Sequence, residues 1–251
     1  MINGKKIAVV FPAYNAEKTL TQTYREVMEQ GVVDYIALVD DHSRDGTVAL
    51  ARTLPGIHVI EHDRNRGYGG NRKTCYRAAL AAGADVVVMV HPDYQYTPRL
   101  ITALASIIAY DVYACSLGSR ILGGNAFSGG MPWWRYVSNR ALTLFQNVVL
   151  NAKLSEYHTG YRAFSRKILE EAPLGDFDDD FIFDNQMLVW ILGRGYGIGE
   201  VTCPTKYFAE ASSISFSRSL KYGVGCLQVA LSYRFNSGAA TRRIKRAGET
   251  P

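Results

Sequence analysis

Two segments near the N-terminus carry polar residues suited to binding a nucleoside. Residues 11–17 (FPAYNAE) follow one short apolar run, and residues 39–47 (VDDHSRDGT) follow another. Polar residues at the carboxyl ends of parallel strands line a binding crevice. Carboxylates such as Asp40 and Asp41 accept hydrogen bonds from hydroxyl and ring N–H groups, which ribose and a nucleobase offer. The segments therefore predict a nucleoside pocket, with turn and capping chemistry as the alternative for Ser43 and Asp45.

A glycine-rich segment, residues 65–72 (NRGYGGNR), stands directly before a predicted helix. Backbone N–H groups and the helix dipole favour an anion at that position. Several basic residues gather in the same region, and a diphosphate would account for them: Arg64, Arg66, Arg72, Lys73 and Arg77. A plain turn between strand and helix is the alternative.

The order and spacing of these segments resemble the family 2 glycosyltransferases, which have a GT-A fold. The resemblance covers about residues 5–222 and includes the strand-Pro-x-Tyr-Asn and Val-Asp-Asp-x-Ser-x-Asp-Gly-Thr patterns. It implies a nucleoside-diphosphate sugar donor, linked to uridine or guanosine. It also implies which residues contact the nucleotide: Pro12, Tyr14, Glu17, Asp40, Asp41, Gly67 and Arg72.

A metal site is implied where the apolar run 86–90 ends. The family has Asp-x-Asp there, and its dolichol-phosphate mannose synthase branch has Asp-Ala-Asp-x-Gln, which holds Mg²⁺ or Mn²⁺ against the donor diphosphate. This chain has His91, Asp93 and Gln95, so an imidazole replaces the first carboxylate. Alternate residues at a strand end point to one side, and an imidazole suits Mn²⁺ better than Mg²⁺. A hydrogen-bonded histidine without a metal is the alternative for His91.

The second half of the chain resembles the acceptor side of the same branch. Arg120 ends a Gly-Ser-Arg segment, in which the family's Arg faces phosphate. Residues 155–164 (SEYHTGYRAF) resemble Asp-x-x-Ser-Gly-Phe-Arg, with Glu156 replacing Asp. Thr159 and Arg162 would then hold an acceptor phosphate. In the closing segment Arg218 or Lys221 would supply a charge to the diphosphate.

Asp184 matches the Asp of the family's Glu-Asp motif, which commonly acts as a general base. A hydroxyl acceptor needs a base, because its pKa lies far above neutral. A phosphate acceptor is already ionised, and Asp184 would then only position a group. The resemblance thus implies an inverting, metal-dependent transferase, with Asp93, Arg120 and Asp184 as catalytic residues.

The acceptor predicted first is a polyprenyl or dolichyl phosphate. The alternative within the class is a sugar or glycan hydroxyl in cell-surface polysaccharide synthesis. His91 motivates an alternative of another class, a non-catalytic protein that binds nucleotide sugars. A homo-oligomer is compatible with the sequence but is not indicated by it.

The elements that must position these residues alternate between strand and helix, which predicts a mostly parallel sheet flanked by helices. Expected strands are 6–11, 35–39, 58–62, 85–90, 112–117 and 199–204. Expected helices are 16–30, 47–53, 68–82, 97–109, 133–153, 162–171 and 184–193. We expect one α/β domain over residues 1–235. Its nucleotide-sugar half is about residues 1–120 and its acceptor half, with C-terminal helices, about 121–235, before a basic, flexible tail at 236–251.

Composition excludes several other classes of protein. The chain has 251 residues, of which 47% are hydrophobic, and its net charge is +5. It has no nucleic-acid-binding motif, so nucleic acid is not an expected partner. The four cysteines lack metal-site spacing and are expected to be reduced, as in the cytoplasm. Apolar residues at helical spacing in 219–235, followed by basic residues, predict peripheral contact with the inner face of the cell membrane.

Overall fold

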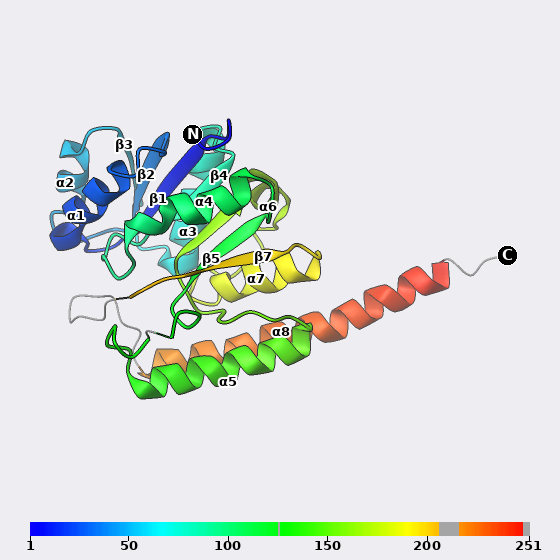
Figure 1. The fold of residues 1–251 in the computed structure, drawn as a ribbon. Helices are drawn as coiled ribbons and strands as arrows, with labels where there is room; N and C mark the ends of the chain where they lie inside the picture. Colours follow the sequence, from blue (N-terminus) through cyan, green and yellow to red (C-terminus); the bar gives the residue numbers. More distant parts are fainter. Residues whose placement is uncertain (125, 206–215, 248–251) are drawn as a thin grey trace.

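A seven-stranded sheet forms the centre of the protein (Figure 1), with strand order β3-β2-β1-β4-β6-β5-β7. The computed structural model describes residues 1–124, 126–205 and 216–247, and in the last helix the side chains of residues 219–235. The strands are β1 (Ile7–Ala13), β2 (Tyr35–Asp40), β3 (Ile57–Glu61), β4 (Val86–Met89), β5 (Cys115–Ser119), β6 (Arg162–Ser165) and β7 (Ile198–Thr202). All neighbouring strands are parallel except where β6 pairs with β4 and β5. The predicted α/β class and mostly parallel sheet are confirmed.

Two layers of helices cover the sheet. The helices are α1 (Glu17–Met28), α2 (Thr47–Thr53), α3 (Gly67–Ala81), α4 (Ile101–Ala109), α5 (Trp133–Leu150), α6 (Arg166–Glu171), α7 (Phe183–Gly193) and α8 (Phe216–Ala247), with a 3-10 turn at Pro98–Leu100. One apolar core joins the sheet to α1, α2 and α4, and a second joins it to α3, α6 and α7. The strands alternate between these cores: Val9 enters one and Val10 the other. Both faces of the sheet are therefore buried, as a parallel sheet requires.

The predicted helix at 162–171 is wrong in its first four residues. Arg162–Ser165 is the antiparallel strand β6, inserted between β4 and β5. The helix begins at Arg166, where the hydroxyl of Ser165 accepts a hydrogen bond from the amide of Ile168. Residues 162–165 are extended because they pair on both sides, and this pairing supplies the backbone hydrogen-bond partners that the edges of β4 and β5 need.

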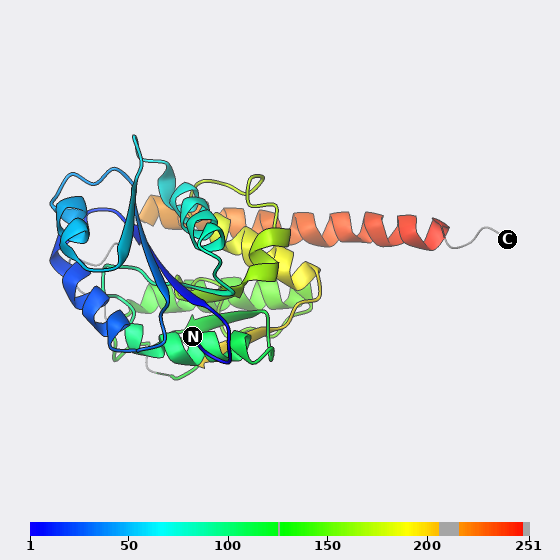
Figure 2. The same ribbon diagram turned by 90° about the horizontal axis from the view of Figure 1, so that it is seen from above.

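Helices α5 and α8 lie side by side at one end of the sheet, and α8 extends beyond the body of the protein (Figures 1 and 2). Helix α8 also packs against α7, and it takes in much of the segment expected as a tail. Within the described residues, no helix combines the length and the apolar character that crossing a bilayer requires.

Candidate functional site

The two N-terminal polar segments meet at one edge of the sheet. Strands β1 and β2 pair so that Ala13 lies beside Asp40. Hydrogen bonds then connect the following loops: Asn15 N–H donates to Ser43 Oγ at 2.8 Å, and Gly46 N–H donates to Glu17 Oε2 at 2.9 Å. Pro12 is half-buried here, whereas Tyr14 is 51% exposed. The structure thus brings the predicted nucleotide residues of both segments to one place.

Asp40 and Asp41 are both buried, and both accept hydrogen bonds from nearby loops. The amide of Ser43 donates to Asp40 Oδ2 at 2.8 Å. The carboxylate of Asp41 accepts from the ring of His62 at 2.8 Å and from the amides of Arg66 at 2.7 Å and Gly67 at 3.1 Å. Asp41 is therefore itself an anion at the N-terminus of α3, where the helix dipole stabilises it.

The glycine-rich turn is shaped by close approach of two backbone segments. Gly67 has φ +82°, and a Cβ there would lie 2.6 Å from the carbonyl oxygen of Asp179. That same oxygen accepts hydrogen bonds from the amides of Gly69 at 2.7 Å and Gly70 at 3.2 Å. The first amides of α3 thus bind groups of this chain, and a contact between Gly67 and a nucleotide phosphate stays a prediction.

A buried cluster of charged side chains lies where α3, α7 and β6 meet. Arg72 donates hydrogen bonds to the Asp184 carboxylate and to the Tyr68 hydroxyl, which in turn donates to Asp184 Oδ2 at 3.0 Å. Arg162 lies 3.7 Å from the same carboxylate. Arg72 and Arg162 are both 0% exposed, whereas Tyr68 and Asp184 also line the cavity described below. Arg72, predicted to contact the nucleotide, lies beside Asp184, and its contact with a nucleotide stays a prediction.

His91 joins this network as a neutral ring. Arg72 donates to His91 Nε2 at 2.6 Å, and because a guanidinium has no acceptor, the ring hydrogen must be on Nδ1. Burial, together with the charges of Arg72 and Arg162, holds the pKa of His91 well below its usual range. The Nε2 lone pair is therefore used, which matches the alternative of a hydrogen-bonded histidine without a metal.

Asp93 and Gln95 have the geometry of a turn at the rim of a cavity. Asp93 Oδ1 accepts a hydrogen bond from the amide of Gln95 at 3.1 Å, and both residues line the cavity. Among the residues that the structure describes, no group of three His, Cys, Asp or Glu side chains could hold a metal. One carboxylate with an amide oxygen still fits Mg²⁺ or Mn²⁺, because such ions take further ligands from water and substrate phosphates.

The acceptor-side residues divide into two groups. Two guanidinium nitrogens of Arg120 donate to Oε1 of the fully buried Glu156, at 2.9 and 2.7 Å, and Arg120 also reaches the cavity. Thr159 donates to the carbonyl of Gly118 at 2.7 Å. The guanidinium of Arg162 donates to the carbonyl oxygens of residues 157, 159 and 184. Thr159 and Arg162 are thus held within the protein and do not line the cavity.

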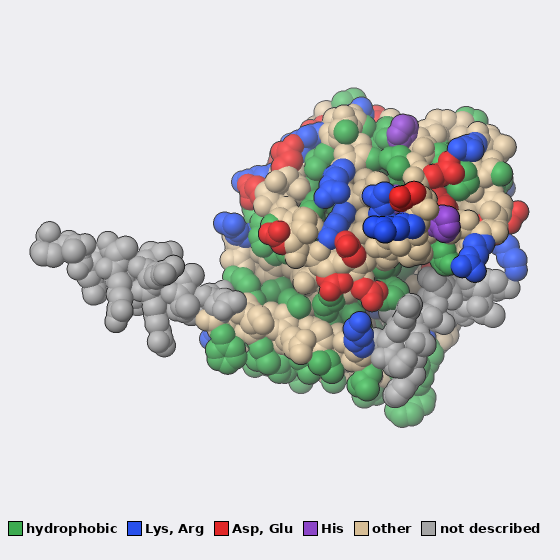
Figure 3. Space-filling view, turned by 180° about the vertical axis from the view of Figure 1, so that it is seen from behind, with side chains coloured by type: hydrophobic (Ala, Val, Ile, Leu, Met, Phe, Trp, Pro, Cys, Tyr) green, Lys and Arg blue, Asp and Glu red, His purple; other side chains and the backbone are tan. Residues whose placement is uncertain are grey.

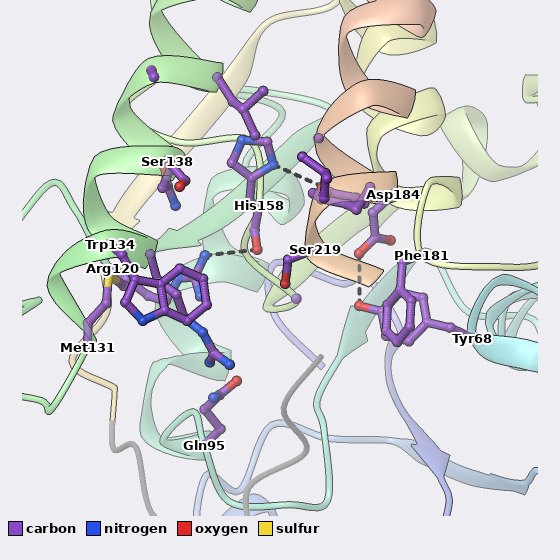
Figure 4. A pocket seen from close by; sticks show the side chains of 18 of the residues that line it. Tyr68, Gln95, Arg120, Met131, Trp134, Ser138, His158, Phe181, Asp184 and Ser219 are labelled. Carbon is purple, nitrogen blue, oxygen red and sulfur yellow. Dashed lines mark hydrogen bonds between the residues drawn. The ribbon is translucent and has the colours of Figure 1, made fainter. Parts of the chain in front are cut away.

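The cavity has a volume of about 540 Å³ and lies between the end of the sheet and helices α5 and α8 (Figure 4). Of the predicted site residues, five line it: His91, Asp93, Gln95, Arg120 and Asp184. The nucleotide residues at 12–17, 40–41 and 67 lie outside it. Lys221 is exposed on α8 and does not line the cavity, and the side chain of Arg218 lies outside the described residues.

His158 is a cavity residue to which sequence reasoning gave no role. Its Nδ1 lies 2.9 Å from the hydroxyl of Tyr222 in α8, while its buried Nε2 has no hydrogen-bond partner among the residues that the structure describes. Burial and the charges of Arg120 and Arg162 lower the pKa of His158 to about 3. Only its place inside the segment 155–164 pointed to it, because Tyr222 is 64 residues away.

Comparison with known proteins identifies the class defined by this fold and site. The solved structure of glucosyl-3-phosphoglycerate synthase from Mycobacterium tuberculosis superimposes with a TM-score of 0.70 at 18% identity, covering 92% of this chain and 79% of that one. This similarity confirms the GT-A fold. The family model "Glycosyl transferase family 2" matches residues 8–172. The chain therefore belongs to family 2 of the glycosyltransferases.

Curated relatives are similar over most of the chain. A UDP-N-acetylglucosamine–dolichyl-phosphate N-acetylglucosaminyltransferase from Methanococcus voltae is 28% identical, covering 66% of this chain and 72% of its own. The polyprenol monophosphomannose synthase of Mycolicibacterium smegmatis is 27% identical, covering 78% and 76% respectively. The predicted resemblance to the polyprenyl-phosphate sugar synthase branch is confirmed, and the chain is a glycosyltransferase.

Proposed function

We propose that this glycosyltransferase transfers a sugar from a nucleoside diphosphate to the phosphate of a polyprenyl phosphate. The names of its relatives in Methanococcus and Mycolicibacterium support a lipid-phosphate acceptor. The solved relative from M. tuberculosis is bound to uridine diphosphate, which supports a uridine-linked donor without excluding guanosine. In the transfer, an acceptor phosphate oxygen attacks the anomeric carbon, the bond to the donor diphosphate breaks, and the configuration inverts.

The hydrogen bonds of Asp184 support a phosphate acceptor over a hydroxyl acceptor. Its carboxylate oxygens accept hydrogen bonds from Arg72 and Tyr68, and Arg162 is close. Burial raises the pKa of Tyr68 well above its usual range, so this phenol stays a donor. A hydroxyl acceptor would need Asp184 to take its proton, whereas an ionised phosphate needs no base. The contacts of Asp184 with Arg72 and Tyr68 fit the role of a positioning residue, which suits an acceptor that is already ionised.

The cavity offers an apolar wall and a polar end, as a prenyl phosphate requires. Met131, Trp134, Leu142 and Leu227 contribute apolar surface from the α5 and α8 side. Arg120 and His158 lie at the polar end, close to one another (Figure 4). Arg120 would attract the acceptor phosphate, although its pairing with Glu156 limits the charge that it offers.

The donor diphosphate would lie between the N-terminal segments and Asp93. Mg²⁺ or Mn²⁺, held by Asp93 and Gln95, would offset the negative charge that develops on the departing diphosphate. Asp40 and the loops at 12–17 and 43–47 would orient the nucleoside. Such a reaction would take place at the cytoplasmic face of a membrane, where a soluble nucleotide sugar meets a lipid acceptor.

A transfer assay with Asp184→Asn tests this function. Purified protein is incubated with a radiolabelled UDP or GDP sugar, Mn²⁺ and either a short prenyl phosphate or a free sugar, and the products are separated. We expect a lipid-phosphate product, a loss well below about 10²-fold in Asp184→Asn, and an unchanged pH profile. Transfer only to the free sugar, with a loss of about 10²-fold or more and a lost basic limb, would establish the hydroxyl alternative.

A further inference from the structure

Helix α5 buries polar side chains and exposes apolar ones. Its buried residues are Asn139, Thr143 and Gln146. Four apolar residues on the opposite side are largely exposed: Trp133 at 71%, Val137 at 54%, Leu144 at 66% and Val148 at 74%. The spacing of these four residues keeps them on one face of the helix. An ordinary surface helix buries its apolar side chains and exposes its polar ones. The exposed apolar face of α5 therefore indicates contact with a partner.

Helix α8 continues the apolar surface beside α5. Its exposed apolar residues Leu220, Val224, Leu231 and Phe235 recur at helical spacing, while Cys226 and Ala230 on the other side are buried. Figure 3 shows hydrophobic side chains gathered along the lower edge of the molecule, where α5 lies. A contiguous exposed apolar surface of this kind marks an interaction site.

The charges of these two helices are of one sign. Neither helix contains Asp or Glu, although the chain has 23 acidic residues. Both contain basic residues: Arg135 and Arg140 in α5, and Arg218, Lys221, Arg234, Arg242, Arg243, Lys245 and Arg246 in α8. An exposed apolar face on helices whose charged residues are all basic matches a bilayer that contains anionic lipids.

We propose that the outer faces of α5 and α8 together form a docking surface for an anionic lipid bilayer, here called the α5/α8 surface. The surface leads to the cavity, because Leu220 and Val224 are exposed and also line the cavity. Trp134 and Leu142 of α5 also line the cavity. A lipid acceptor could therefore pass from the bilayer to Arg120 between the two helices, and this step rests on the proposed function.

Charge argues against a second copy of this chain as the occupant. In a symmetric dimer, the same surface would face itself. The basic residues of both copies would then lie near one another with no acidic residue of α5 or α8 to compensate them. An anionic bilayer removes this repulsion and covers the same apolar side chains.

Vesicle flotation with a charge-insertion variant tests the proposal. The full chain is mixed with phosphatidylcholine vesicles, with and without phosphatidylglycerol, and compared with Leu144→Glu/Val148→Glu. Neither position lines the cavity, and both are exposed, so the variant should fold. Val112→Glu is the matched control, because Val112 is 62% exposed next to β5, away from α5 and α8. We expect flotation of wild type and control with anionic vesicles, and at least about hundredfold weaker binding of the double variant.

Two further measurements separate this proposal from the proposed function. Transfer to a short prenyl phosphate in solution should be equal in wild type and the double variant, whereas transfer to a long-chain acceptor in vesicles should be lost only in the variant. Vesicle binding without any transfer would leave the docking surface standing and refute the function. Wild-type protein that stays unbound, or a dimer that Leu144→Glu/Val148→Glu dissociates in ultracentrifugation, would overturn the docking surface.

Discussion

The two halves of the site hold their carboxylates in different ways. On the nucleotide side, Asp40, Asp41 and Glu17 accept hydrogen bonds from backbone amides of nearby loops. On the acceptor side, Asp184 and Glu156 are held by the guanidinium groups of Arg72 and Arg120. Backbone amides carry no net charge, so the hydrogen bonds on the nucleotide side fix the shape of the loops without pairing opposite charges. The pairs on the acceptor side balance opposite charges inside the protein, so loss of one partner leaves the other as an unpaired buried charge.

The acceptor side should therefore be much more sensitive to loss of one partner. Arg72→Met leaves the Asp184 carboxylate buried without its nearest cation. We expect the free energy of unfolding, measured in urea, to fall by about 3–5 kcal/mol. The control is Arg52→Met, which removes an exposed pair with Glu61 and should cost less than about 1 kcal/mol. Equal losses in the two variants would show that the buried cluster has no special role in stability.

Asp93 lies between the nucleotide side and the acceptor side, and its substitution tests where the metal binds. Asp93→Asn should lower transfer by about 10²-fold or more, because a bound ion supplies several kcal/mol of charge stabilisation. Excess chelator should abolish wild-type activity, and Mn²⁺ should restore it. His91→Asn should leave the preference between Mn²⁺ and Mg²⁺ unchanged, because its Nε2 accepts from Arg72. Full activity in chelator, or a changed metal preference in His91→Asn, would contradict this assignment.

The fold was largely predictable because its strands are short apolar runs that alternate with helical segments along the chain. Two such runs that end in polar residues were predicted to line one crevice, and the pairing of Ala13 with Asp40 places them together. Strand β6 was not predictable locally, since Arg162–Ser165 contains a buried arginine and leads straight into a helix. Its conformation depends on β4 and β5, which lie far away in the sequence.

The candidate site shows the same division. On the nucleotide side, the turn from Asp40 to Ser43 is local in the sequence, although the bonds that join the two loops span 28 and 29 residues. Arg72 and Asp184 are 112 residues apart, and no local pattern pairs them. From the sequence, Arg72 was therefore grouped with the neighbouring basic residues. Asp184 was predicted as a base without Arg72 and Tyr68 as its hydrogen-bond partners. Burial of both groups, which decides their chemistry, is a property of the assembled fold.

His158 gives the smallest predicted effect and concerns acid stability. Its pKa is lowered to about 3 in the folded protein, against an ordinary value of 6.5. Between these values the unfolded chain binds a proton that the folded protein does not. The stability associated with the neutral ring is thus fully present above pH 6.5 and is lost as the pH falls toward 3.

Urea unfolding at pH 7 and pH 5 measures this contribution. The difference between the two free energies of unfolding should be smaller in His158→Gln than in wild type, by about 2 kcal/mol. His58→Gln is the control, because His58 is exposed on β3 and should leave the difference unchanged. Carboxylates elsewhere titrate alike in all three proteins, so they cancel in the comparison. If His158→Gln loses as much stability as wild type on acidification, the ring of His158 is protonated in the folded protein at pH 5, and an acceptor phosphate would meet a cation there.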